Sequence, residues 1–124
     1  MAKILIIEDE ALLRGSLTAE FKRAGFDVSE AKDGWEGLQM ARREHLDILL
    51  LDIILPKIQG LDVLKLLRGD PWGKTVPVVV LTSLGDGDTA SQAAVFGVYS
   101  ILVKKDWTPE EVVEKVREKL SSKK

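Results

Sequence analysis

The sequence contains no cysteine and only one histidine, His45, among its 124 residues. Without cysteine the chain cannot form a disulfide bond, present a thiol nucleophile or build a cysteine-ligated metal site. A single histidine also excludes zinc sites that require two or more imidazole ligands. Any metal ion must therefore be held by oxygen atoms.

The sequence also lacks long apolar runs and a large excess of charge of either sign. The apolar "ILII" after Lys3 is too short for a membrane span and too promptly followed by acids for a secretory signal peptide. Twenty acidic and eighteen basic residues give a net charge of -2, which provides no broad positive surface for nucleic acid. We therefore expect a cytoplasmic protein with no membrane contact and no direct contact with nucleic acid.

The length of 124 residues is typical of one domain that builds its own hydrophobic core. No linker, low-complexity tract or repeat divides the chain. We expect a single domain over residues 1–121 and a short basic tail at 122–124. Because no output domain is expected after the last helix, any output would pass through a partner protein or through self-association.

Apolar segments followed by residues at helical spacing occur five times along the chain. The predicted strands are residues 3–8, 26–31, 46–51, 76–81 and 99–103. Strands as continuously apolar as "ILLL" and "VVVL" are typical of a parallel sheet covered by helices on both faces. We therefore predict an α/β three-layer sandwich. Thr108, Pro109 and Glu111 form the N-terminal signature of the last helix.

Polar side chains follow four of the five predicted strands, at the edge where open parallel sheets bind ligands. They are Glu8, Asp9 and Glu10 after the first strand, Asp52 after the third, Thr82 and Ser83 after the fourth, and Lys104 and Lys105 after the fifth. Taken singly, each has a structural explanation, such as a helix cap or a solvated charge. Together they suit an oxygen-bound Mg²⁺ and a phosphoryl group.

A purely structural role fits Asp52 least well among these residues. It lies in the apolar stretch "LDILLLDIILP", where an unpaired carboxylate is costly to bury. Asp9 and Asp52 could supply carboxylate ligands to the metal ion. The Asp52 carboxylate could then attack a phosphorus atom and become an aspartyl phosphate. Thr82 and Lys104 would donate hydrogen bonds and positive charge to the phosphoryl oxygens.

Four segments make the sequence similar to the response-regulator receiver domains of two-component signalling over nearly its whole length. They are "IIEDE", "LLLDIILPKIQG", "VVVLTS" and "ILVKK". The resemblance implies a stand-alone domain with the flavodoxin-like (βα)5 fold, whose five parallel strands have the order 2-1-3-4-5. It also implies that a sensor histidine kinase or phosphotransfer protein donates a phosphoryl group to Asp52 in a Mg²⁺-dependent step. Such a domain assists its own phosphorylation and dephosphorylation but is not a turnover enzyme.

The same resemblance implies roles for individual residues. The metal ligands would be Glu8, Asp9, Asp52 and the backbone carbonyl of Ile54. Thr82 and Lys104 would bind the phosphoryl group and relay its presence to a downstream protein partner. The chain would be a monomer or a phosphorylation-dependent dimer.

The sequence departs from the family pattern near Lys104. The position three residues before Lys104, usually aromatic in this family, is Ile101. Tyr99 lies two residues earlier, on the same face of an ideal strand, so the possible switch residues are Thr82, Ile101 and Tyr99. Lys105 stands where the family often has a proline, and we expect a trans peptide bond after Lys104.

Two further departures concern the lifetime of the phosphorylated state. Ile54 and Leu84 stand where many relatives carry polar residues that influence loss of the phosphoryl group. Neither side chain can orient a water molecule for in-line attack. Ser83 is small enough to leave the site open to a phosphodonor. We therefore expect an aspartyl phosphate that hydrolyses slowly.

Three other functions fit parts of the sequence. A phosphatase with an aspartate nucleophile would need a second acid two residues after Asp52, where the chain has Ile54. A flavin carrier shares the fold class, but the three acids after the first strand would repel the flavin phosphate. A receiver-like interaction module with altered or lost phosphorylation is weakly favoured by Ile101 and opposed by retention of the acidic, threonine and lysine positions.

Overall fold

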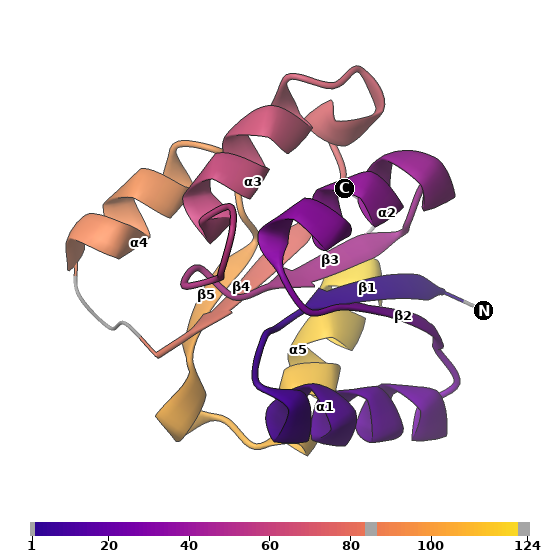
Figure 1. The fold of residues 1–124 in the computed structure, drawn as a ribbon. Coiled ribbons are helices and arrows are strands. Elements are labelled where there is room, and N and C mark those ends of the chain that lie inside the picture. The colour runs from indigo at the N-terminus through magenta and orange to yellow at the C-terminus, as the bar shows by residue number, and fades with distance from the viewer. Residues whose placement is uncertain (1, 84–86, 122–124) are drawn as a thin grey trace.

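The computed structural model describes residues 2–83 and 87–121, which form a sheet with helices on both faces (Figure 1). The five strands found in these ranges are parallel and have the order β2-β1-β3-β4-β5. The strands are β1 (Lys3–Ile7), β2 (Asp27–Ala31), β3 (Ile48–Leu51), β4 (Val78–Thr82) and β5 (Ser100–Val103). The helices are α1 (Ala11–Arg23), α2 (Gly34–Glu44), α3 (Gly60–Arg68), α4 (Gly87–Ala94) and α5 (Pro109–Ser121), with short 3-10 helices η1 (Trp72–Lys74) and η2 (Lys104–Asp106). The predicted α/β sandwich and its strand order are confirmed.

Some parts of the prediction fall outside the described residues. These are the basic tail at 122–124 and Leu84. Within the described ranges, no helix combines the length and the apolar composition that crossing a membrane requires. The peptide bond after Lys104 is trans, as expected.

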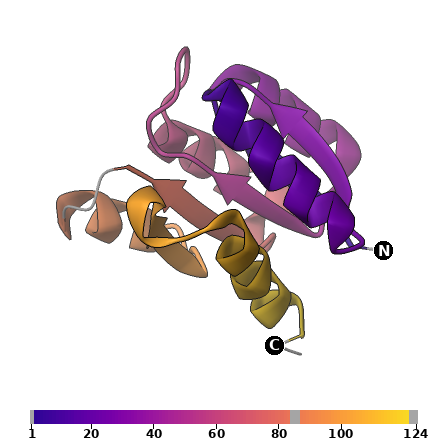
Figure 2. The same ribbon diagram turned by 90° about the horizontal axis from the view of Figure 1, so that it is seen from below.

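Apolar side chains fill both faces of the sheet. Ile4 and Ile6 of β1 belong to the cluster packed against α1 and α5, whereas Leu5 and Ile7 belong to the cluster covered by α2, α3 and α4. Figures 1 and 2 show these two groups of helices on opposite sides of the sheet. The alternation follows the two-residue period of a β-strand. Burial on both faces explains why β3 contains no polar residue.

The last helix begins where the sequence predicts. The Glu111 N–H donates a hydrogen bond to Oγ1 of Thr108 over 3.2 Å, and the Thr108 N–H donates to Oε1 of Glu111 over 2.8 Å. This reciprocal pair satisfies two backbone donors at the helix terminus. The first residue of α5 is Pro109, which has no N–H that needs an acceptor.

Gly60 allows the chain to pass very close to the end of β3 before α3 begins. Its N–H donates to the carbonyl oxygen of Ile53 over 2.8 Å. A β-carbon at Gly60 would lie 2.5 Å from the carbonyl oxygen of Asp52 and 2.6 Å from Cα of Ile53. Gly15, in α1, has no such neighbour within 4 Å. The two glycines should therefore tolerate a methyl group very differently.

We expect Gly60→Ala to lower the free energy of unfolding by about 2 kcal/mol, because the methyl group is forced against backbone atoms. Gly15→Ala should raise it by about 0.5–1 kcal/mol, because alanine is the better helix former and the site is open. Urea unfolding followed by circular dichroism measures both changes. Wild-type stability of Gly60→Ala would contradict the close approach at the end of β3.

Candidate functional site

Two buried carboxylates lie side by side at the carboxyl edge of the sheet. Glu8 directly follows β1 and Asp52 directly follows β3, and these strands are hydrogen-bonded neighbours. Glu8 is 2% exposed and Asp52 is 3% exposed. Burial of two acids requires strong local compensation, because each loses its hydration and they repel each other.

Lys104 supplies part of this compensation. It begins η2, directly after β5. Its Nζ lies 2.9 Å from Oε1 of Glu8 and 3.0 Å from Oδ2 of Asp52. Nζ also lies 3.4 Å from Oε2 of Glu10. One ammonium group therefore joins residues that follow β1, β3 and β5.

Backbone donors satisfy the remaining oxygens of the two buried acids. The Ile54 N–H donates to Oδ1 of Asp52 over 3.1 Å. The Glu10 N–H donates to Oε2 of Glu8 over 2.9 Å. Every carboxylate oxygen of Glu8 and Asp52 thus has a donor, which is the condition for burying such groups. The apolar stretch tolerates Asp52 because its side chain leaves the strand at this polar edge.

The site keeps a net negative charge. Burial raises the pKa of Asp52, and it raises the pKa of Glu8 to about 7, against the hydrogen bonds from Glu10 and Lys104. Burial disfavours the charge of Lys104, but its hydrogen bonds and ion pairs with Glu8 and Asp52 prevail, so its pKa lies above its usual value. Lys104 therefore stays protonated, and the acids around it still favour a further cation.

Asp9 completes a set of acids that fits a metal ion. One carboxylate oxygen from each of Glu8, Asp9 and Asp52 lies within 4.8 Å of the others. Glu8 and Asp52 are buried, whereas Asp9 is exposed, so the cluster can be reached from solvent. Oxygen ligands of this kind are preferred by hard divalent cations. The acidic cluster can therefore hold such an ion.

Thr82 is the last residue of β4 and is completely buried. Its register partner on β5 is Val103, which immediately precedes Lys104. Ser83 is exposed and Ile54 is 43% exposed. The structure thus brings the predicted residues of all four strand ends to one edge of the sheet.

The expected relation between Ile101 and Tyr99 does not hold. Ile101 packs against the apolar cluster that contains α3 and α4 residues, whereas Tyr99 packs against the cluster that contains α5 residues. The Tyr99 hydroxyl donates a hydrogen bond to Glu118 of α5. Tyr99 precedes β5, so the two-residue period of the strand does not include it. The two side chains therefore lie on opposite faces of the sheet.

Two residues at the site were not among the predicted site residues. Glu10 contacts Lys104, and its place beside Glu8 and Asp9 was a signal in the sequence. Arg14 donates from Nη1 to the carbonyl oxygen of Glu8 over 2.8 Å. No sequence signal distinguishes Arg14 from other basic residues on exposed helices.

Comparison with curated proteins identifies similar regulators. The chain is 34% identical over 117 residues to the DNA-binding dual master transcriptional regulator RpaA of Synechocystis sp., covering 94% of this chain and 48% of RpaA. It is 44% identical over 92 residues to the response regulator PleD of Caulobacter vibrioides, covering 70% of this chain and 19% of PleD. The chain thus spans about half of the first relative and a much smaller part of the second.

Solved structures and family models point to the same group of proteins. The chemotaxis response regulator CheY4 of Vibrio cholerae superposes with a TM-score of 0.88 at 26% identity, covering 95% of this chain and 98% of that chain. The model of the response regulator receiver domain matches residues 4–117. With its strand order, its acidic edge and this match, the chain belongs to the response regulator receiver domain family.

Proposed function

We propose that this chain is a phosphoacceptor signalling domain in which Asp52 receives a phosphoryl group from a histidine kinase or a phosphotransfer protein. The observation that carries the proposal is the position of the Asp52 carboxylate. It lies at the carboxyl edge of the sheet, in contact with Lys104 and beside the acids Glu8 and Asp9. A carboxylate in this setting combines a nucleophile, a fixed cation and a metal site.

In the proposed reaction a carboxylate oxygen of Asp52 attacks the phosphorus of phosphohistidine. An O–P bond forms as the P–N bond to the imidazole breaks, and the electron pair of that bond leaves with the histidine. Bound Mg²⁺, held by Glu8, Asp9, Asp52 and the backbone carbonyl of Ile54, would reduce the repulsion between the carboxylates and the incoming phosphate. The domain accepts the group and is not a turnover enzyme.

Lys104 would change its partners during the reaction. Its Nζ contacts Oδ2 of Asp52 in the unphosphorylated protein. In the aspartyl phosphate, Oδ2 of Asp52 carries less negative charge, so the phosphoryl oxygens become the better acceptors for the Lys104 ammonium group. Thr82, at the neighbouring strand end, would donate its hydroxyl to the same group. The movement of these two residues would alter the surface that a downstream protein partner recognises.

We also propose a cytoplasmic location, which follows from the proposed kinase partner. RpaA is described as a DNA-binding regulator, but we propose no direct contact of this chain with nucleic acid. An interaction module with lost phosphorylation is the second candidate, and Ile101 in place of an aromatic residue is the observation that favours it.

Asp52→Asn should abolish labelling by acetyl phosphate and Mg²⁺, because the amide cannot act as the carboxylate nucleophile. Intact-protein mass spectrometry measures the uptake of one phosphate per chain. Asp62→Asn, which changes an exposed acid in α3, is the matched control and should be labelled at the wild-type rate. Labelling of Asp52→Asn at the wild-type rate would refute the assignment, and an unlabelled wild-type protein would favour the interaction module.

Binding of Mg²⁺ should strengthen as the pH rises through about 7, because Glu8, with a pKa of about 7, must release its proton before it can bind the metal. Titration calorimetry without a phosphodonor measures the affinity at each pH. Glu8→Gln should remove this dependence. Asp9→Ala should weaken binding at every pH but retain the dependence. A wild-type affinity that does not change across neutral pH would contradict this role of Glu8.

Loss of phosphate from Asp52 should be slow, because Ile54, which is 43% exposed beside the site, cannot orient an attacking water molecule. The double variant Ile54→Asn, Leu84→Glu supplies hydrogen-bonding groups and should lose phosphate about tenfold faster, if the barrier falls by about 1.4 kcal/mol. Phosphate release after removal of the donor measures both rates. Loss of phosphate from the wild-type protein within seconds, or equal rates of loss in the wild type and the double variant, would disprove the role of the apolar side chains.

A further inference from the structure

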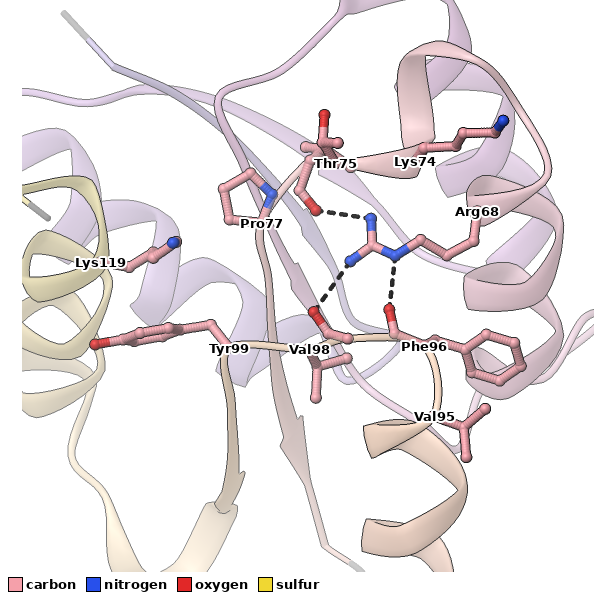
Figure 3. Close-up of a pocket in the computed structure, with 11 residues that line it drawn as sticks. Arg68, Lys74, Thr75, Pro77, Val95, Phe96, Val98, Tyr99 and Lys119 are labelled. Carbon is pink, nitrogen blue, oxygen red and sulfur yellow. Dashed lines mark hydrogen bonds between the residues drawn. The ribbon is translucent and has the colours of Figure 1, made fainter. Parts of the chain in front are cut away.

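A cavity of about 830 Å³ lies at the edge of the sheet opposite to Asp52. It is bordered by η1, by the segments that precede β4 and β5, and by α5 (Figure 3). Pro77 directly precedes β4 and Tyr99 directly precedes β5, whereas Thr82 and Lys104 lie at the other ends of these strands. The cavity is therefore separated from the acidic site by the length of a strand.

The charged side chains that line this cavity are all cationic. They are Arg68, Lys74 and Lys119, and none of the eleven lining residues is acidic. Within residues 2–83 and 87–121, ten of the sixteen lysines and arginines have a described carboxylate within 4.0 Å, and six do not. Three of these six border the cavity, which gives it a concentration of uncompensated positive charge in a chain of net charge -2.

Arg68 holds the walls of the cavity in place. Its guanidinium group donates hydrogen bonds to backbone carbonyl oxygens of the two segments that precede β4 and β5. The acceptors are Gly73 (2.7 Å), Val76 (2.8 Å), Phe96 (2.7 Å) and Gly97 (3.4 Å). A guanidinium group has five N–H donors, so one N–H of Nη2 has no acceptor among the described residues. The cavity is thus preformed and retains one oriented donor.

Most of the other lining side chains are apolar. Pro77 and Val98 lie between Arg68 on one side and Lys119 on the other (Figure 3). The Lys119 ammonium lies 5.4 Å from the centroid of the Tyr99 ring, which holds it near the cavity. An apolar surface with a few fixed polar groups, in a volume of about 300–1,000 Å³, is typical of sites for small organic ligands.

We propose that this cavity binds a nucleoside diphosphate. The diphosphate carries several negative charges, which complement Arg68 and Lys119, and its oxygens can accept the remaining N–H of Arg68. The ring systems of the nucleoside would cover the apolar surface formed by Pro77 and Val98. The site uses neither Asp52 nor a metal ion, so it is independent of the proposed phosphorylation.

Titration calorimetry with ADP in the presence of EDTA tests the proposal, because without divalent cations the acidic edge at Asp52 repels anions. ADP should bind one-to-one with a Kd below about 1 mM. Adenosine and inorganic pyrophosphate each lack part of the ligand and should bind at least about tenfold more weakly. Absence of saturable ADP binding, or equal binding of pyrophosphate, would overturn the proposal.

Charge-removing variants locate the site. Lys119→Ala should weaken ADP binding about tenfold through loss of a charge-assisted contact, whereas Lys74→Ala, whose side chain points away from Arg68 and Lys119 in Figure 3, should weaken it less. Lys22→Ala removes an exposed and equally unpaired lysine from α1 and should leave the affinity unchanged. Arg68 is left intact because its replacement would leave four backbone carbonyl oxygens without this hydrogen-bond donor and would destabilise the fold. An equal loss of affinity in Lys22→Ala would indicate non-specific attraction and refute the site.

Amide chemical shifts give a second, independent readout. ADP should shift the backbone resonances of residues 73–77 and 95–99, which surround the cavity. Shifts concentrated at Asp52, Ile54 and Lys104 instead would show that the nucleotide occupies the phosphoryl site, and the proposal would be wrong. Because the measurement needs no phosphodonor, it stands whether or not Asp52 is phosphorylated.

Discussion

The contact of the Lys104 ammonium group with two buried carboxylates is the interaction on which the site depends. Glu8 and Asp52 lie 2.9 and 3.0 Å from Nζ and are almost completely buried. Without this cation, two acids at neighbouring strand ends would repel each other after losing their hydration. Burial raises the pKa of both acids even so, which means that Lys104 offsets only part of the cost of burying their charges. The nearby carboxylate of Asp9 completes a cluster of three acids that suits a metal ion.

A half-buried cation at each edge of the sheet has different neighbours. At the carboxyl edge Lys104 is surrounded by carboxylates, which neutralise its charge. At the amino edge Arg68 is surrounded by backbone carbonyls, which accept its hydrogen bonds but carry no net charge. Its positive charge therefore remains available to solvent and ligands. One edge consequently favours cations and the other favours anions, although the whole chain is nearly neutral.

The helices and strands, and the polar residues that follow the strands, can be predicted from local sequence patterns. The apolar run of β3 and the reciprocal bonds between Thr108 and Glu111 are local properties, since they depend on periodicity and on residues three positions apart. In a parallel sheet all carboxyl ends share one edge. For this reason the sequence predicts that Asp52 and Lys104 share one site. The strand order itself came from the resemblance to the family.

Which groups pair across that edge, and what lies at the opposite edge, depends on how distant segments pack together. The contact of Glu10 with Lys104 joins residues 94 positions apart, so no local pattern contains it. Tyr99 lies on the α5 side because it precedes β5, where the strand period does not apply. The cavity beside Arg68 forms where the segments before two strands meet. Such features depend on the packing of distant segments. A periodic pattern in the sequence shows only which residues share one face of a single helix or strand.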